Sequence, residues 1–415
     1  MTAELPDDIQ RVAWWRPYLC ILRWCLLAVL VVSITGAGLN MYWAEPQGLE
    51  TGIPSPGGWD YTGIMHVHTK YSDGSGTFQN LADAAVDARA DFVFTADHNT
   101  VEPISDGAEG WYGDILIASG TEVTYEGGHY LYFSDRDNMR TFNFHTPRRP
   151  LDNPLYNELT FLSHPVEGSH PNTDWKFTGL TGIEIVNGNV AWRDDSITEL
   201  LPSFPWYGVF QSPLNILVDR PDRTIAVWDS LLQYGPCVAL GAVDAHARIP
   251  LTDRHFLAFP SYSKAFRFVR THLVTEAPLS ENYNNARRTL LSALQTGRGY
   301  IEIGDFSDPR GFLFQAGDAH NSRQYSGQIA WNDSLELEVR IPLLSDATIT
   351  LYCDGRPMMN SRRPQMIVPI EKSGVYRVEV TVGRKRFPWF ENHDYLWILS
   401  NAIRVTQGVP GRGQP

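Results

Sequence analysis

The spacing of hydrophobic positions changes twice along the chain, and each part predicts a different kind of structure. From Trp24 to Trp43 the sequence is apolar, without an ionisable residue, and about as long as a helix needs to cross a bilayer. From residue 60 to about 305, short apolar runs alternate with polar or amphipathic stretches, which is typical of an α/β domain. After residue 310, apolar and polar positions alternate strictly, as at Leu335, Leu337 and Val339, and predict an antiparallel β-sandwich-like domain.

These patterns divide the chain into five expected segments. They are a tail and anchor at 1–43, a Pro- and Gly-rich linker at 44–59, an α/β domain at 60–305, a β-domain at 310–406 and a flexible tail at 407–415. Within the α/β domain we expect helices around Leu81–Arg89 and within 281–298, the second ending at a glycine.

The apolar segment near the start predicts a single membrane-spanning helix. Aromatic residues suited to the membrane interface bracket it: Trp14, Trp15, Trp24, Tyr42 and Trp43. Arginines precede the segment and acidic residues follow it, which favours a cytoplasmic N-terminus and an extracytoplasmic remainder, periplasmic if the cell is bacterial. A cleaved signal peptide and a buried core helix are the alternatives.

Composition restricts the classes of partner. The chain has 415 residues and a formal net charge of -13, so its surface repels polyanions, and stable binding to duplex nucleic acid is not expected. Its four cysteines form no CxxC pair, which excludes a thiolate zinc site and a disulfide framework.

Candidate metal ligands recur where the expected strands end. His66 and His68 flank one residue, so on a strand both imidazoles project from the same side, and Asp244 and His246 repeat this spacing. Further donors follow or adjoin other apolar runs: Asp73, His98, Glu122, His129 and His164.

These nine side chains exceed what one ion can use. Imidazoles and carboxylates without thiolates suit divalent Zn, Mn, Fe or Mg, so we expect two to three ions. A single HxH pair is weak evidence, because two histidines on a strand can be a polar pair facing solvent.

The string HVHTKYSDG, followed by TADHN, a strand-end Glu, SHP and GAVDAH, resembles the PHP (polymerase and histidinol phosphatase) superfamily over residues 60 to 300. The resemblance implies a distorted (β/α)7 barrel and metal-dependent hydrolysis, most often of phosphomonoesters. It also implies three metal positions. His66, His68, Glu122 and Asp244 would hold one ion, Glu122 would bridge to a second held by His129 and His164, and Asp73, His98 and His246 would hold a third.

The function expected on this basis is a metal-dependent phosphoesterase that cleaves phosphomonoesters, phosphodiesters or nucleotides with a hydroxide bridging two ions. Asp244, His246, Glu122 and Arg248 are the expected catalytic residues. Arg248 could complement a phosphate, as could Lys70, although either could also be a solvated loop cation.

Several other polar residues carry open or ordinary interpretations. Glu184 could orient a ligand histidine, or it could cap a strand or pair within the core. Histidines without a close partner, such as His272, are expected at the surface or satisfied in the core. The Asp318/His320 pair is expected to be a polar turn, and the run 384–386 a solvated hairpin.

Two other functions remain open. An N-terminal anchor, a PHP domain and a trailing β-domain ending in DYLWILSNAIRV are together similar to the carbaryl hydrolase branch, which implies hydrolysis of a carboxyl ester or aryl carbamate. The other is a non-catalytic metal-binding module whose β-domain engages a cell-envelope partner. The substrate expected is therefore a small phosphate ester, or an ester or carbamate.

Overall fold

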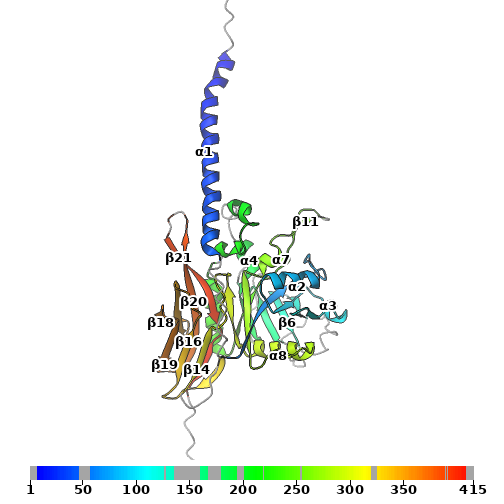
Figure 1. The fold of residues 1–415 in the computed structure, drawn as a ribbon, viewed down its shortest axis with the longest axis vertical. Coiled ribbons are helices and arrows are strands. Elements are labelled where there is room, and N and C mark those ends of the chain that lie inside the picture. The colour runs from blue at the N-terminus through cyan, green and yellow to red at the C-terminus, as the bar shows by residue number, and fades with distance from the viewer. Residues whose placement is uncertain are drawn as a thin grey trace, which may run out of the picture.

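The computed structural model describes residues 7–45, 57–125, 128–134, 159–166, 179–193, 201–217, 219–252, 255–318, 325–387, 389 and 391–407 (Figure 1). Most of the expected linker at 44–59, nearly all of the expected tail at 407–415, and His320 lie outside the described residues. The fold combines helices and sheets, which confirms the predicted mixed α/β class.

A long helix, α1 (Asp7–Ala44), projects from one end of the globular part (Figure 1). Its segment Tyr18–Ala44 is long and apolar enough to cross a membrane, by length and composition alone. The expected span, Trp24–Trp43, lies inside this helix. The structure differs from the expectation at the C-terminal end of that span, where side chains are buried against protein rather than exposed.

That end of α1 packs closely because two of its residues have no side chain. A Cβ at Gly36 would lie 2.3 Å from the ring of Phe387, and one at Gly38 would lie 2.6 Å from the ring of Trp206. Trp206 Nε1 also donates a hydrogen bond of 2.7 Å to the carbonyl oxygen of Ile34. The helix is therefore seated on the globular part, and the small residues permit the close approach.

The region after α1 alternates strands and helices. Its strands are β1 (Trp59–Val67), β2 (Phe92–Thr95), β3 (Gly110–Tyr112), β4 (Ile115–Ser119), β5 (Thr121–Tyr125), β6 (Gly128–Phe133), β7 (Leu159–Ser163), β8 (Gly182–Asn187), β9 (Val238–Ala242), β10 (Ile249–Pro250), β11 (Phe256–Leu257), β12 (Val269–Thr275) and β13 (Gly299–Ile303). Its helices are α2 (Phe78–Asp87), α3 (Glu102–Ser105), α4 (Gly188–Arg193), η3 (Phe204–Trp206), η4 (Pro213–Leu217), α6 (Asp222–Tyr234), α7 (Tyr262–Ala265) and α8 (Tyr283–Gln295).

Helices α2 and α8 lie where the sequence predicted helices, although α2 begins three residues before and ends two residues before the expected Leu81–Arg89, and α8 is shorter than the expected 281–298. Thr77 caps α2 in a capping box with Asn80, and the buried face of the helix includes Phe78 and Leu81. Helix α8 is followed by Gly297 at φ 66°, a left-handed conformation that glycine adopts at little cost.

Most strands of this region form two sheets, which are linked by backbone hydrogen bonds at two places, and among the described strands β10 and β11 pair only with each other. One sheet has the order β3-β4-β2-β1-β12-β13, and the other has the order β5-β6-β7-β8-β9. Beyond β9, the His68 amide donates a hydrogen bond of 3.0 Å to the Ala245 carbonyl oxygen. Beyond β2, the Asn99 amide donates 2.9 Å to the Glu122 carbonyl oxygen. The ends of β1 and β2 are thereby bonded to the second sheet.

The last strands form an all-β region. They are β14 (Leu313–Gly317), β15 (Gly327–Ala330), β16 (Glu336–Arg340), β17 (Ala347–Cys353), β18 (Arg356–Ser361), β19 (Gln365–Pro369), β20 (Gly374–Arg386), β21 (Glu391–Ser400) and β22 (Ile403–Thr406). Alternate residues of β17 are buried, as the strict hydrophobic alternation predicted. Most pairings are antiparallel, but β15 pairs with β22 in parallel.

Two features of this region differ from expectation. Strand β21 pairs with β13, so one sheet continues across the expected boundary between residues 305 and 310. The run 384–386 lies in the β20–β21 hairpin, as predicted, but Arg384 is buried and ion-paired with Asp346, Arg386 is half-buried, and only Lys385 of the three is exposed. The domain bounds stay a prediction.

Candidate metal centre

The nine predicted donors gather at one end of the two sheets. His66 lies in β1, His68 one residue after it and His98 three residues after β2. His164 follows β7, and Asp244 and His246 follow β9, whereas Glu122 and His129 are the second residues of β5 and β6, and Asp73 lies in the loop between β1 and α2. Because neighbouring strands end at the same edge, side chains far apart in sequence come together here.

Glu122 occupies the middle of the cluster. Its Oε2 lies 3.1 Å from His66 Nε2, 3.4 Å from His68 Nε2 and 3.1 Å from His98 Nδ1. Its Oε1 lies 3.1 Å from His129 Nδ1 and 3.2 Å from His164 Nε2. The carboxylate therefore contacts imidazoles on both of its oxygens, while the side chain is almost completely buried.

Two more carboxylates extend the cluster toward solvent. Asp244 Oδ1 lies 3.2 Å from His68 Nε2, 3.6 Å from His66 Nε2 and 3.5 Å from His246 Nδ1. Asp73 Oδ2 lies 3.3 Å from His246 Nε2. Asp244 is buried, whereas the Asp73 side chain is 53% exposed, so the cluster is open on the Asp73 side.

Three groups of these donors have ligand atoms close enough together to hold a metal ion, within 4.8 Å of one another. They are His66, His68 and Asp244; His68, Asp73, His98 and His246; and His98, Glu122 and His129. The grouping differs from the one implied by the resemblance. His68 also joins the Asp73 group, His98 rather than His164 completes the Glu122 and His129 group, and Glu122 is absent from the group of His66, His68 and Asp244.

The electrostatics of the cluster keep its carboxylates charged. Burial alone would raise the pKa of Glu122, but the surrounding imidazoles hold it well below its ordinary value, and the pKa of Asp244 is lowered in the same way. Burial and the charge of His68 lower the pKa of His98 to about 4, so this imidazole is neutral at pH 7. Anionic carboxylates and a neutral imidazole are the forms that bind a divalent cation.

Protonated histidines balance these carboxylates in the metal-free cluster. Burial lowers the pKa of His68, but hydrogen bonds to Asp244 and Glu122 outweigh it and raise the pKa to about 9. The pKa of His66 is likewise raised, by Glu122 and Glu184 against its burial. His164 Nδ1 is buried without a hydrogen-bond partner among the described residues. The donor set, its charge and this orphaned nitrogen all fit a site built for cations.

Three of the donors also have unusual backbone conformations. His66, His164 and Asp244 have φ values of 61°, 25° and 48°. Non-glycine residues rarely adopt positive φ, and each such residue costs of order 1–3 kcal/mol. The surrounding hydrogen bonds hold these residues in place, and this strain directs their side chains into the cluster.

Glu184 orients two of the histidines. Its Oε1 accepts a hydrogen bond of 2.6 Å from His66 Nδ1, and its Oε2 accepts 2.8 Å from the His164 amide and 3.0 Å from Asn187 Nδ2. Because a carboxylate only accepts, His66 Nδ1 carries the hydrogen and its Nε2 faces Glu122. Of the two roles left open for Glu184, the structure therefore favours orientation of a ligand histidine.

Two supporting residues were missed by sequence reasoning. The buried Asp97 accepts hydrogen bonds from the Thr69 amide, at 2.8 Å, and from Ser72 Oγ, at 2.7 Å, which fixes the loop after His68. Tyr262 donates to the His68 carbonyl oxygen at 2.8 Å. Asp97 adjoins His98 in TADHN, a signal that could have found it, but nothing near Tyr262 in the sequence points to the cluster.

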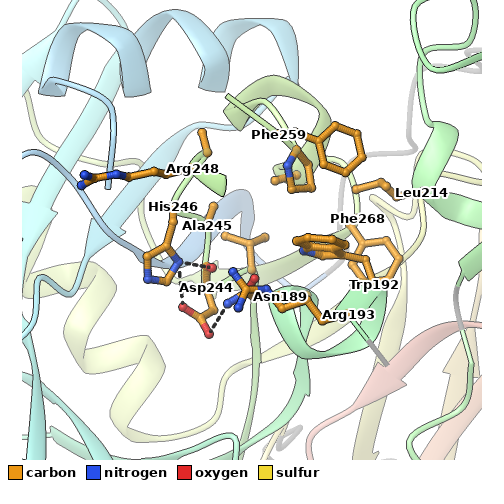
Figure 2. Close-up of a pocket in the computed structure, with 15 residues that line it drawn as sticks. Asn189, Trp192, Arg193, Leu214, Asp244, Ala245, His246, Arg248, Phe259 and Phe268 are labelled. Atoms are coloured by element: carbon orange, nitrogen blue, oxygen red, sulfur yellow. Dashed lines mark hydrogen bonds and ion pairs between the residues drawn. The ribbon is translucent and has the colours of Figure 1, made fainter. Parts of the chain in front are cut away.

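A pocket opens beside Asp244 and His246 (Figure 2). Arg248 and Arg193 line it, and Asn189 Nδ2 donates 3.3 Å to Asp244 Oδ2. The Arg248 guanidinium contacts the main-chain oxygen of Asp73 at 3.4 Å. Lys70 is exposed and does not line this pocket.

Comparisons with known proteins give little. No family model matches the chain, and no curated protein matches it. Among solved structures, the chain is similar to a crystal structure from Bacteroides vulgatus of a two-domain protein containing a predicted PHP-like metal-dependent phosphoesterase, with 12% identity and a TM-score of 0.40. The match covers 86% of this chain and 100% of that one, and a TM-score this low supports no conclusion about the fold or the activity.

Proposed function

We propose that this chain is a metal-dependent phosphoesterase acting on phosphomonoesters, phosphodiesters or nucleotides. One observation carries the proposal: nine histidine and carboxylate side chains gather around Glu122, which contacts five of the imidazoles, and eight of the nine form three groups with metal-ligand spacing. A buried carboxylate needs a compensating positive charge. Imidazoles supply that charge only while they are protonated, and they become metal ligands when they lose the proton.

The chain's own residues have distinct roles in this proposal. Bound divalent cations would lower the pKa of water and neutralise charge on phosphoryl oxygens. Glu122 and Asp244 supply the buried negative charge that retains the cations, and Glu184 keeps His66 aimed at them. Hydrolysis forms a bond between the water oxygen and phosphorus and breaks the bond to the leaving oxygen, which takes up the proton that water loses.

Two arginines favour a phosphate over a carbonyl substrate. Arg248 and Arg193 line the pocket that contains Asp244 and His246. A phosphoryl group carries charge on several oxygens in the ground and transition states, so cations on more than one side stabilise it. Attack on a carbamate places charge on one oxygen, so cations on several sides stabilise it less.

The proposal includes the finer features of the fold and its location. A closed barrel of the PHP type is supported by the backbone bonds that link the ends of β1 and β2 to the second sheet. It is also supported by one core cluster that combines side chains from both sheets, among them Met65, Phe94, Phe161 and Leu240. Helix α1 would cross the membrane once, leaving the metal centre outside the cytoplasm.

A substrate panel tests the proposal. The full chain, purified in detergent and supplied with Zn, Mn or Fe, is offered p-nitrophenyl phosphate, bis(p-nitrophenyl) phosphate and an aryl methylcarbamate. We expect two to three ions per chain by elemental analysis and turnover of a phosphate ester that exceeds turnover of the carbamate.

Glu122→Gln is the matched control because it keeps the size of the side chain and removes its charge. It should abolish both metal retention and turnover. A metal-loaded wild type that prefers the carbamate would overturn the choice of bond class, and failure to retain any metal would overturn the metal centre.

A further inference from the structure

The apolar part of α1 that lies outside the globular part is no longer than a hydrocarbon core. The candidate membrane span begins at Tyr18, and burial against protein begins near Gly36. At 1.5 Å per residue the stretch between them covers roughly 27 Å, against about 30 Å for a hydrocarbon core. If α1 spans the bilayer, the membrane surface therefore reaches the end of the globular part beside α1, which we call the rim.

That rim is bonded to α1 by segment 201–217. In addition to the Trp206 hydrogen bond, Asn215 Nδ2 donates 2.9 Å to the Ala44 carbonyl oxygen, and the Ser212 amide donates 3.0 Å to Glu45 Oε1. Asn215 is completely buried. Segment 201–217 therefore stays beside the helix and at its depth.

The rim also presents apolar side chains. The β10–β11 hairpin and the tip of the β20–β21 hairpin lie at the same end of the globular part as α1 (Figure 1). Together with segment 201–217 they carry large exposed side chains: Leu201, Val209, Leu251, Phe256, Leu257 and Trp389. Trp389 is 79% exposed, and exposed Lys385 lies four residues before it. Tryptophan and lysine are typical of a membrane interface.

The same segment supports an apolar wall of the pocket at the metal centre, to which it contributes Leu214. Phe259 lines this pocket, and its ring lies 5.3 Å from that of Phe204 and 4.8 Å from that of Tyr207. Phe259 and Trp192 lie on one side of the pocket, whereas His246 and Asp244 lie on the other (Figure 2). A continuous run of contacts thus leads from α1, through segment 201–217, to the metal donors.

We propose that the substrate is a membrane-resident phosphate ester whose alcohol carries a long hydrocarbon chain. Its phosphate meets the metal centre and Arg248, and the adjoining part of its chain lies along Phe259 and Trp192 while the remainder stays in the bilayer. Hydrolysis leaves the long-chain alcohol in the membrane and releases the phosphate. This inference rests on the proposed phosphoesterase function and names its substrate class.

The test uses the full chain in phosphatidylcholine vesicles with Zn and Mn. Dioleoyl phosphatidic acid in the vesicle is compared with its water-soluble dibutyryl counterpart, which has the same headgroup, and with p-nitrophenyl phosphate. We expect turnover of the long-chain ester to exceed that of the short-chain ester by about tenfold or more at equal bulk concentration, because burial of the chain adds binding energy.

Surface variants supply an independent readout. Leu257→Glu combined with Trp389→Glu should lower turnover of the vesicle substrate by about tenfold, because charged side chains are expelled from the interface, and leave p-nitrophenyl phosphate turnover unchanged. Ile367→Glu is the matched control, since Ile367 is 54% exposed and lies on β19, far from α1 (Figure 1). It should change neither turnover.

The outcomes separate this inference from the function on which it rests. Equal turnover of long- and short-chain esters, with p-nitrophenyl phosphate hydrolysed, overturns the membrane substrate and leaves the phosphoesterase intact. The same holds if Ile367→Glu lowers vesicle turnover as much as the rim variant. Failure of the metal-loaded enzyme to cleave any phosphate ester overturns both.

Discussion

The metal centre and the cluster around His272 are both buried groups of histidines and carboxylates, yet they balance charge in opposite ways. His272 lies in β12 between Asp60, at 2.9 Å, and Glu302, at 3.1 Å, and its ring stacks on Tyr300. Arg270 then bridges Glu302 and Asp305, with both contacts at 2.7 Å. Each carboxylate in this cluster has a hydrogen-bonded cation or hydroxyl.

The metal centre lacks such fixed cations. Among the described residues, its carboxylates form ion pairs with imidazoles alone, and the Arg248 guanidinium contacts a main-chain oxygen. Imidazole can lose its proton and become a ligand, whereas guanidinium cannot. The charges of the His272 cluster are therefore balanced by protein groups alone, whereas metal ions can take over the charge balance at Glu122.

Removing one carboxylate from the metal centre should give the largest effect on function. Asp244→Asn keeps the shape of the side chain and removes a buried anionic donor, so turnover should fall by about 10³-fold or more. The free energy of unfolding of the metal-free protein should fall only modestly, because His66 and His68 lose one buried partner but keep their contacts with Glu122. Steady-state kinetics and urea unfolding measure the two quantities. Retained activity would exclude Asp244 from the site.

The opposite result is expected at the complete cluster. Arg270→Met keeps the length of the buried side chain but leaves Glu302 and Asp305 without their shared cation, which should cost about 3–5 kcal/mol in the free energy of unfolding. Urea unfolding measures this cost, and turnover per folded molecule should stay close to that of the wild type. A loss of turnover in the folded fraction would show that the two clusters are not independent.

Some parts of the metal centre could be predicted from the sequence, and others could not. The nine candidate donors that lie together in the structure could be selected from the sequence because most adjoin a short apolar run, and neighbouring strands bring such positions together. The same logic could not find Tyr262, whose hydroxyl contacts the backbone of His68 and His246 from a distant helix. Contacts to main-chain atoms leave no pattern in side-chain chemistry.

The fold was predictable to the same extent. Local periodicity predicted α2, α8 and the alternating strands, but it gives no information on the pairing of β13 with β21 or the contact of Gly36 with Phe387. Both join segments that are remote in sequence.

A smaller effect is expected from the residue that orients two of the histidines. Glu184→Gln keeps a possible acceptor for His66 Nδ1 but removes its charge, so metal affinity should fall by about 10- to 100-fold. Competition with a chelator measures the affinity, and excess metal should restore most of the turnover. If added metal restores nothing, Glu184 is needed for folding of the site rather than for its affinity.

The smallest effect expected is a pH dependence that belongs to the His272 cluster. Burial alone would lower the pKa of His272, but the Asp60 and Glu302 carboxylates outweigh it and raise the pKa to about 9. Because this pKa lies above the unfolded value of about 6.5, the stabilisation is fully present below pH 6.5 and is lost as the pH rises through about 9. The free energy of unfolding of metal-saturated protein should therefore fall over that range by up to about 1.4 kcal/mol per pH unit. His272→Gln should be less stable at pH 6 and flatten the profile, as urea titrations at several pH values would show. An unchanged slope in His272→Gln would mean that another group, and not this cluster, titrates there.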